Sequence, residues 1–516
     1  MGVLVAKSLL EPLFVLLVSL RFCVGNTGGW EGDQETDGFA MGPCSIDRVH
    51  FTELDLADFE ASYLGKRPVI IEGLIDATWP ARRDSKWGRQ ELINSVGERT
   101  TKVGSGAGIV YSDGESVLSI HLSQYLADMR KNAEATGAAR GTSRDPDFSF
   151  DVEFLDRCPE LLEDFTVPDH FQSFNNKTSL LNGMSWHIMS IGGSRGGLPF
   201  HVHGQTWLGL VFGAKRWFVY PPGEGPPPSV ESALGGHPLL SSWEWCRTVL
   251  PHLEPQHQPM QCTQHGGDLF YLPPNWKHLT VNAGEAIAVG GQEVYLGEKR
   301  LKDCLEVLED HPDDVDALKG AGLALAHRGM DILNAPGGEE EGGDGNDGVD
   351  SGEEAWIEAE ALLEQSVAMF QRAATLQPGQ PSFRLLLAEM LMELGRDSEA
   401  NAVISQAAKD FSGPSAAGLP SAVPINTVMA TQLNLVRFMV GSGMYDEAEG
   451  LLQSDALQRA DLPEVLAERG AIAAEMGRMR EAEDMLLHAM ELAPGSETVM
   501  GRLEWVQQQL ETAAEL

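Results

Sequence analysis

The amino-acid sequence changes its pattern near residue 300, and this change constrains the fold more than any other feature. Before that point, short runs of β-branched and aromatic residues alternate with Gly- and Pro-containing turns, as in a buried sheet. After it, the apolar residues follow helical spacing. A chain of 516 residues is also too long for one hydrophobic core. We therefore expect two or three domains, with a mainly-β domain followed by an all-α domain.

The first half contains six runs that predict strands, at residues 68–72, 187–191, 207–212, 216–220, 269–272 and 286–289. Helical stretches at 58–63 and 122–130 interrupt them. Residues 223–260 are rich in Pro, Gly, His and Trp, and we interpret them as a surface insertion between two strands.

The second half repeats itself. The pattern G-x-x-x-E-A begins at Gly395, Gly443 and Gly477, and the last two glycines are 34 residues apart. This spacing is the tetratricopeptide period. We expect each glycine to end one helix and each alanine to lie at a helix–helix contact. Residues 299–516 are therefore predicted to form a tetratricopeptide-like solenoid, closed by a capping helix over 497–516. Its acidic, Gly-rich segment 337–354 has the composition of a disordered loop.

The N-terminus is typical of a secretory signal peptide over residues 1–25, because Lys7 precedes an apolar run that is too short to span a bilayer. Residues 26–45 are predicted to be a flexible leader. The mature chain is then expected in the lumen of the endoplasmic reticulum or, alternatively, outside the cell. In that pathway the sequon at Asn176 predicts a glycosylation site.

The net charge of -39 argues against nucleic acid or an acidic membrane surface as a partner, since phosphates would be repelled. No segment after the signal peptide is apolar enough to predict membrane insertion.

The cysteines leave disulfide pairing open. Five of the 6 Cys follow the signal peptide, and no CxxC motif is present. Cys246 and Cys262 bracket the insertion, whereas Cys44 and Cys158 lie at the two ends of the first part of the β domain. We consider Cys246–Cys262 and Cys44–Cys158 as candidate pairs, although spacing alone does not fix connectivity.

His201-Val202-His203 indicates a metal site. On a strand, residues i and i+2 point to the same face, so both imidazoles can bind one ion. His278 follows a strand-and-turn sequence and is the third candidate ligand. Neutral imidazole suits Fe, Zn, Ni and Cu. Three histidines also resemble a zinc hydrolytic site with an open position, although the sequence contains no matching base.

Two longer strings surround these histidines. Residues 213–222 read G-x-K-R-W-x-x-Y-P-P, and residues 267–278 read G-D-x-x-x-x-P-x-x-W-x-H. Both strings, with their order and separation, resemble the JmjC family of cupin-fold, iron(II)- and 2-oxoglutarate-dependent oxygenases. The resemblance implies a mainly-β double-stranded β-helix with flanking helices over residues 46–298. It does not extend to the helical repeats.

The resemblance also implies roles for individual residues. His201 and His278 match the two histidine ligands of the family, and Lys215 matches the lysine that binds the distal carboxylate of 2-oxoglutarate. His203 stands where the family usually has Asp or Glu, and Leu198 stands where it often has Thr or Ser. No Asn lies between His203 and Lys215, where the family often has one.

Two functions follow from these observations. The first is an Fe(II)/2-oxoglutarate-dependent protein hydroxylase whose repeats present a protein or peptide client. The second is a catalytically silent scaffold that acts through protein–protein contacts in the lumen. The family resemblance favours the hydroxylase, whereas His203 and Leu198 favour the scaffold.

Overall fold

The computed structural model describes residues 27–32, 38–111, 118–138, 146–171, 187–234, 236–237, 239–293, 297–334, 348–411, 425–454, 457, 463–493 and 496–515. The predicted signal peptide and the sequon at Asn176 lie outside these residues.

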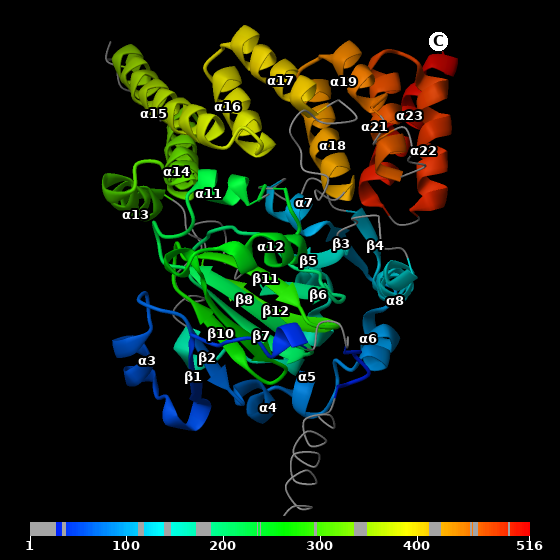
Figure 1. The fold of residues 1–516 in the computed structure, drawn as a ribbon. Helices are drawn as coiled ribbons and strands as arrows, with labels where there is room; N and C mark the ends of the chain where they lie inside the picture. Colours follow the sequence, from blue (N-terminus) through cyan, green and yellow to red (C-terminus); the bar gives the residue numbers. More distant parts are fainter. Residues whose placement is uncertain are drawn as a thin grey trace, which may run out of the picture.

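Two sheets form the central β domain (Figure 1). The large sheet has the strand order β1-β2-β10-β7-β12-β6-β5-β3-β4, and the small sheet has the order β11-β8-β9. All pairs are antiparallel except β1 with β2. The bounds are β1 (Asp47–His50), β2 (Val69–Glu72), β3 (Thr100–Gly104), β4 (Leu118–His121), β5 (Phe148–Asp151), β6 (His187–Gly192), β7 (Thr206–Phe212), β8 (Ala214–Tyr220), β9 (Met260–His265), β10 (Leu269–Leu272), β11 (Lys277–Asn282) and β12 (Ala286–Gln292). All six predicted strands are confirmed.

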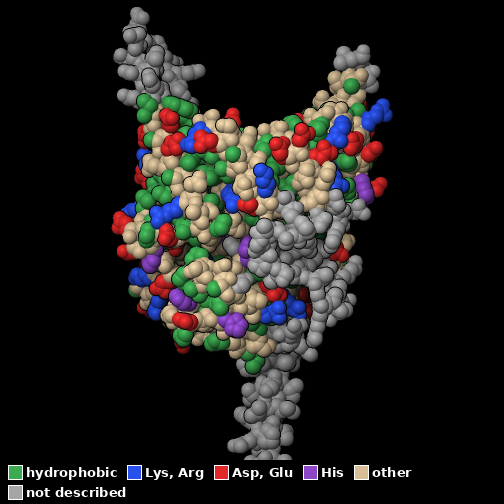
Figure 2. Space-filling view, turned by 45° about the horizontal axis from the view of Figure 1, so that its top comes forward, with side chains coloured by type: hydrophobic (Ala, Val, Ile, Leu, Met, Phe, Trp, Pro, Cys, Tyr) green, Lys and Arg blue, Asp and Glu red, His purple; other side chains and the backbone are tan. Residues whose placement is uncertain are grey.

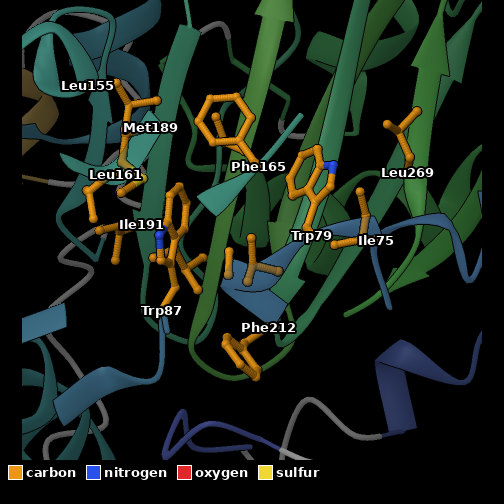
Figure 3. Packing of buried hydrophobic residues seen from close by; sticks show 14 of the residues in the cluster. Ile75, Trp79, Trp87, Leu155, Leu161, Phe165, Met189, Ile191, Phe212 and Leu269 are labelled. Atoms are coloured by element: carbon orange, nitrogen blue, oxygen red, sulfur yellow. The ribbon is translucent and has the colours of Figure 1, made fainter. Parts of the chain in front are cut away.

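The outer face of the large sheet is covered by helices from the first part of the chain, and an aromatic-rich core lies between them (Figure 3). Trp79, Trp87 and Trp207 are each fully buried there. A Cβ atom on Gly209 would lie 2.3 Å from the Trp79 ring, so the absence of a side chain in β7 permits this packing. These helices are α3 (Leu56–Ser62), α4 (Leu74–Thr78), α5 (Pro80–Arg83), α6 (Arg89–Val96), α8 (Leu122–Ala138) and α9 (Phe154–Arg157). The short helix α7 (Gly106–Tyr111) lies instead beside the helices of the second half of the chain.

From residue 297 onward the described residues form helices and connecting turns without strands, and they lie above the barrel that the two sheets form (Figure 1). Its helices are α13 (Gly297–Asp310), α14 (Val315–Leu333), α15 (Gly348–Leu376), α16 (Pro381–Glu393), α17 (Asp397–Phe411), α18 (Ile425–Gly441), α19 (Tyr445–Leu452), α21 (Pro463–Glu475), α22 (Met479–Leu492) and α23 (Glu497–Glu515). Acidic and basic side chains are intermingled on the face of this region seen in Figure 2. The multidomain architecture that the sequence predicts is confirmed.

The three G-x-x-x-E-A copies adopt one local structure. Gly395, Gly443 and Gly477 have φ of 69°, 73° and 77°, which is the left-handed conformation of a helix C-terminus. In each copy, the amide of the residue after the glycine donates to a carbonyl five residues earlier. The alanines at 400, 448 and 482 are fully buried, so helix pairs pack closely at each repeat. This arrangement is consistent with tetratricopeptide-like repeats.

Three segment predictions need correction. The leader is not uniformly flexible, because Trp30 is 3% exposed and its indole Nε1 donates to the carbonyl of Trp87 at 3.0 Å. The insertion at 223–260 contains α11 (Pro228–Ala233) and α12 (Ser242–Thr248), and its buried side chains join the core of the helical region. Residues 348–354 are helical as the start of α15, and the rest of the acidic segment lies outside the described residues.

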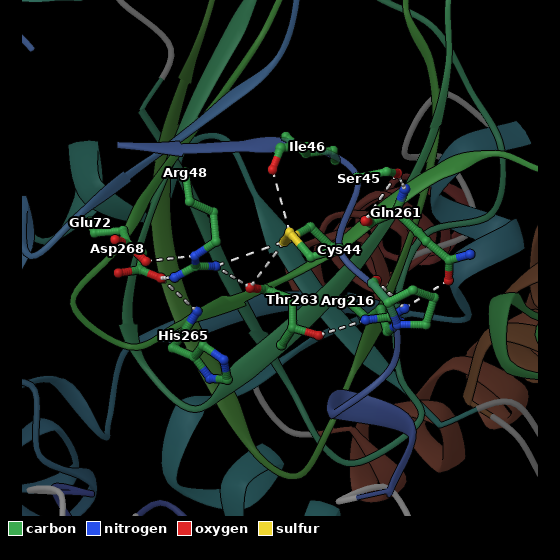
Figure 4. Close-up of a disulfide and its surroundings, with 12 residues drawn as sticks. Cys44, Ser45, Ile46, Arg48, Glu72, Arg216, Gln261, Thr263, His265 and Asp268 are labelled. Atoms are coloured by element: carbon green, nitrogen blue, oxygen red, sulfur yellow. Dashed lines mark hydrogen bonds and ion pairs between the residues drawn. A yellow bond between two sulfur atoms is a disulfide. The ribbon is translucent and has the colours of Figure 1, made fainter. Parts of the chain in front are cut away.

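The structure pairs Cys44 with Cys262, so both candidate pairings were wrong (Figure 4). The segment before β1 runs along β9, where the amide of Ser45 donates to the carbonyl of Gln261 at 2.8 Å, and this brings the two cysteines together. Cys158 is buried in the core beneath the large sheet, whereas Cys246 is buried against the helical region. Both are free thiols.

Candidate metal centre

The strand β11 and the chain segment 196–201 together position the histidines. His201 and His278 face each other in an antiparallel bridge, in which each amide donates to the other residue's carbonyl at 3.0–3.1 Å. The amide of Thr280 donates to the carbonyl of Leu198 at 3.0 Å, which continues the pairing. A Cβ atom on Gly197 would lie 1.9 Å from the carbonyl oxygen of Thr280, so only glycine permits this approach.

The three predicted ligands are brought together. One nitrogen from each of His201, His203 and His278 lies within 4.8 Å of the others. Neighbouring nitrogen ligands of one ion lie about 3.0–3.4 Å apart, at bond lengths of about 2.1 Å each. The rings therefore need to approach one another by roughly 1–2 Å at most to bind one ion. No carboxylate joins this cluster among the described residues.

The hydrogen bonds of the rings select one tautomer. The Nδ1 atoms of His201, His203 and His278 lie 2.7, 2.7 and 2.9 Å from the backbone carbonyls of Pro199, Gly204 and Trp276. A carbonyl oxygen only accepts, so each Nδ1 carries the hydrogen and each Nε2 keeps its lone pair. Backbone carbonyls orient metal-binding histidines in the same way in known sites.

The imidazoles are also neutral. Burial lowers the pKa of His201 to about 4. Burial, reinforced by repulsion from His201, lowers the pKa of His203 to about 3. Burial is again the largest cause for His278, whose pKa lies well below its usual value. Weaker contributions come from Lys319 to His201 and from Arg300 to His203, two cations of the helical region. All three lone pairs are therefore available at physiological pH.

Lys215 occupies a different part of the barrel interior. It is 2% exposed and lies opposite Asn282 in the register of β8 with β11. Its Nζ donates to the Asn282 Oδ1 at 2.8 Å and lies 5.1 Å from the centre of the Phe148 ring. No carboxylate among the described residues forms an ion pair with it, and burial lowers its pKa to about 7. The buried Nδ2 of Asn282 has no hydrogen-bond partner.

Lys215 and Asn282 are therefore adjacent buried residues with donor capacity and no anion among the described residues to accept from them. This arrangement fits a bound carboxylate. Asn282 does not belong to either of the two strings that surround the histidines in the sequence. A signal was present, because His278, Thr280 and Asn282 alternate along one strand and so share its inner face. Leu198 offers no hydroxyl, but its amide donates to the Oγ1 of Thr280 at 3.2 Å.

A cavity of about 850 Å³ adjoins the histidines. The barrel contributes His201 and His203 to its lining, the insertion contributes Trp245, and the helical region contributes side chains from α13, α14, α16 and α17. The volume falls in the upper part of the range of known ligand pockets. The motifs of the barrel gave no indication of this helical wall.

Two other residues of the 267–278 string, Asp268 and Trp276, make structural contacts. Asp268 accepts from the amide of His265 at 3.1 Å and pairs with Arg48 at 2.8 Å, which holds the turn before β10 (Figure 4). Trp276 is 7% exposed and packs in the barrel core.

Residues 56–290 match the family described as a cupin-like domain. The chain is 25% identical to human JmjC domain-containing protein 8 over 262 residues, which cover 51% of this chain and 88% of that protein. It is 28% identical to the Arabidopsis thaliana lysine-specific demethylase JMJ21 over 264 residues, or 49% of this chain and 26% of the demethylase. It is 27% identical to the Caenorhabditis elegans bifunctional arginine demethylase and lysyl-hydroxylase psr-1 over 280 residues, or 51% and 64% of the two chains. The chain thus spans about a quarter of JMJ21.

Among the helices of the described residues, none has the length and apolar character needed to cross a membrane.

Proposed function

We propose that this chain, whose residues 56–290 match the cupin-like domain family and resemble JmjC proteins, is an Fe(II)/2-oxoglutarate-dependent protein hydroxylase of the secretory pathway. The observation that carries the proposal is the convergence of three neutral imidazoles within 4.8 Å in the barrel. Relatives named as demethylases and hydroxylases support the reaction class.

Iron(II) bound by the three Nε2 atoms would supply oxygen activation, and this donor set also suits other divalent metals. The backbone carbonyls at Pro199, Gly204 and Trp276 hold the rings in one tautomer. Lys215 and Asn282 bind the distal carboxylate of 2-oxoglutarate through their buried donors. Three neutral ligands leave the charge of a divalent ion uncompensated by the protein, which favours an anionic co-substrate beside it.

Two features support a lumenal location. The disulfide between Cys44 and Cys262 belongs to an oxidising compartment. The N-terminal sequence and the sequon at Asn176 are typical of a secreted or lumenal glycoprotein. A glycosidase that removes N-linked sugars should reduce the apparent mass of the native chain, and Asn176→Gln should abolish that reduction. Native chain in the cytosol with an intact N-terminus would contradict the location.

A catalytically silent scaffold is the second candidate. It is favoured by His203, which replaces the usual carboxylate ligand, and by the apolar side chain of Leu198 in the cavity lining. In that case the helical region acts by contacting a client protein, as solenoids commonly do.

A spectroscopic titration separates the two functions. The chain from residue 26 is purified without oxygen, loaded with iron(II) and titrated with 2-oxoglutarate while the charge-transfer band of the chelate is recorded. We expect a band that His201→Ala and Lys215→Ala each abolish. His252→Ala, at an exposed position in the insertion, is the matched control and should keep it.

Absence of the band, together with no protection from unfolding by 2-oxoglutarate, would exclude the hydroxylase. His203→Asp adds a direct test of silencing. Co-substrate turnover by this variant, but not by the wild type, would show that His203 had silenced the native site.

A further inference from the structure

The helical region contributes two cations to the cavity beside the histidines. Arg300 on α13 and Lys319 on α14 both line it and are half-buried. Neither forms an ion pair with a carboxylate of the described residues. Arg300 instead contacts the thiol of Cys304. A half-buried cation without a counter-ion can attract an anionic group of a ligand, because its charge is only partly screened by water.

The other charged groups of the lining are largely balanced. Lys277 pairs with Asp316 at 3.0 Å, and Glu293 pairs with Lys299 at 3.7 Å. Arg384 pairs with Asp410 on the neighbouring helix. The remaining carboxylate, Glu231, accepts from the Trp245 Nε1 at 2.9 Å and interacts electrostatically with Lys277. Arg300 and Lys319 are therefore the two cations of the lining that have no ion-pair partner among the described residues.

The rest of the lining is mainly apolar. Phe200, Leu240, Leu323, Phe383 and Phe411 come from the barrel, the insertion and the helices. A cavity of about 850 Å³ with apolar walls and two cations suits a ligand that combines an apolar stem with an anionic group. Because the barrel, the insertion and the helical region each form part of its wall, the cavity is concave and not a flat docking surface.

We propose that Arg300 and Lys319 bind a carboxylate of the substrate, so that the helical region selects an acidic peptide side chain for the cavity that His201 and His203 line. The proposal names a substrate class for the proposed hydroxylase, and the reaction on that substrate rests on the proposed function. Binding of the carboxylate itself requires no iron and can be measured separately. Lys215 lies outside the lining of this cavity, so its proposed co-substrate site is distinct.

The test uses two pentapeptides that differ at one residue, acetyl-Gly-Ala-Glu-Ala-Gly-amide and its Gln counterpart. Both are titrated into the full mature chain loaded with zinc, and binding is measured by calorimetry. We expect the Glu peptide to bind about tenfold more tightly, which is the usual contribution of a charge-assisted hydrogen bond. The double variant Arg300→Gln, Lys319→Gln should remove this preference.

Two controls separate the cavity from general charge effects. Lys302→Gln changes an exposed residue on α13 outside the lining and should keep the preference. Lys215→Met should keep it as well, because that residue belongs to the proposed co-substrate site. Acetyl-glutamate distinguishes the sources of the carboxylate, since equal affinity for it would indicate a small acid rather than a peptide.

Several results would overturn the proposal. These are equal binding of both peptides, no binding of the Glu peptide at millimolar concentration, or a preference that survives in the double variant. Failure of the hydroxylase function gives a different pattern, in which the Glu preference persists although no iron–co-substrate band forms.

Discussion

The buried side chain of Lys215 leads to a quantitative prediction of how folding stability depends on pH. The side chain is 2% exposed, and burial lowers its pKa from 10.5 to about 7. In the unfolded chain the lysine remains protonated up to about pH 10. Between pH 7 and 10 the unfolded chain therefore binds one more proton than the folded chain, and this group makes folding more favourable as pH rises.

The magnitude follows from the same values. Each pKa unit corresponds to about 1.4 kcal/mol, so a folded-state pKa near 7 costs roughly 5 kcal/mol of stability below that pH. Replacing the lysine by methionine keeps most of the stem and removes the charge. We expect Lys215→Met to stabilise the protein relative to wild type at pH 7, and this advantage should shrink by about 2 kcal/mol at pH 9.

Urea denaturation followed by tryptophan fluorescence measures the effect. Among the 11 Trp, only Trp356 and Trp505 follow residue 300, so the signal reports mainly on the barrel. Lys302→Met, at a side chain with 75% exposure on α13, controls for the loss of one positive charge from an acidic protein. The difference between the two variants isolates burial at position 215.

A stability difference that stays constant between pH 7 and 9 would refute the reasoning, because it would mean that Lys215 keeps its charge at both values. Binding of 2-oxoglutarate should also make the stability of the wild type less dependent on pH. A carboxylate beside the lysine raises its pKa, so saturating co-substrate should flatten the pH dependence.

Three further changes have expected outcomes. Gly197→Ala should lower zinc affinity at least tenfold in a chelator competition, since its Cβ meets the β11 backbone, whereas Gly450→Ala has open space and should leave affinity unchanged. Cys44→Ser should lower the free energy of unfolding by about 2–5 kcal/mol, because it removes the disulfide. Reductant should lower the free energy of unfolding of the wild type to the same value. A wild type whose stability does not respond to reductant would count against the disulfide. Glu468→Ala should destabilise the helical region by about 3–5 kcal/mol in thermal unfolding, because this 1%-exposed carboxylate pairs with two arginines, and a change below 1 kcal/mol would contradict a buried network.

The sequence predicted those elements whose side chains repeat one property. The six strands that it identified have continuous β-branched or aromatic runs, because both of their faces are buried. β11 was not predicted, since its inner face carries His278, Thr280 and Asn282 while only Leu279 and Val281 face the second core. A strand that lines a functional site loses the apolar continuity by which strands are recognised.

Contacts between distant segments were beyond prediction. The Cys44–Cys262 bond joins residues 218 positions apart, and it depends on how the segment before β1 runs along β9. The histidine triad could be predicted from the sequence, because its motifs specify ligand types and spacing. The positions of Arg300 and Lys319 in the cavity could not be predicted, since nothing in their local sequence distinguishes them from other cations on helix surfaces.

One connection between the two domains runs through β11, the strand that carries the proposed metal ligand His278. Lys277 precedes His278 on β11, and its Nζ pairs with Asp316 on α14 at 3.0 Å. Burial disfavours the charge of this lysine, but Asp316 and Glu231 outweigh that effect and raise its pKa. Because neighbouring residues on a strand point to opposite faces, one side of β11 is fixed by the helical region and the other holds a proposed metal ligand. A shift of α14 would therefore alter the cavity wall and the strand of the proposed ligand together.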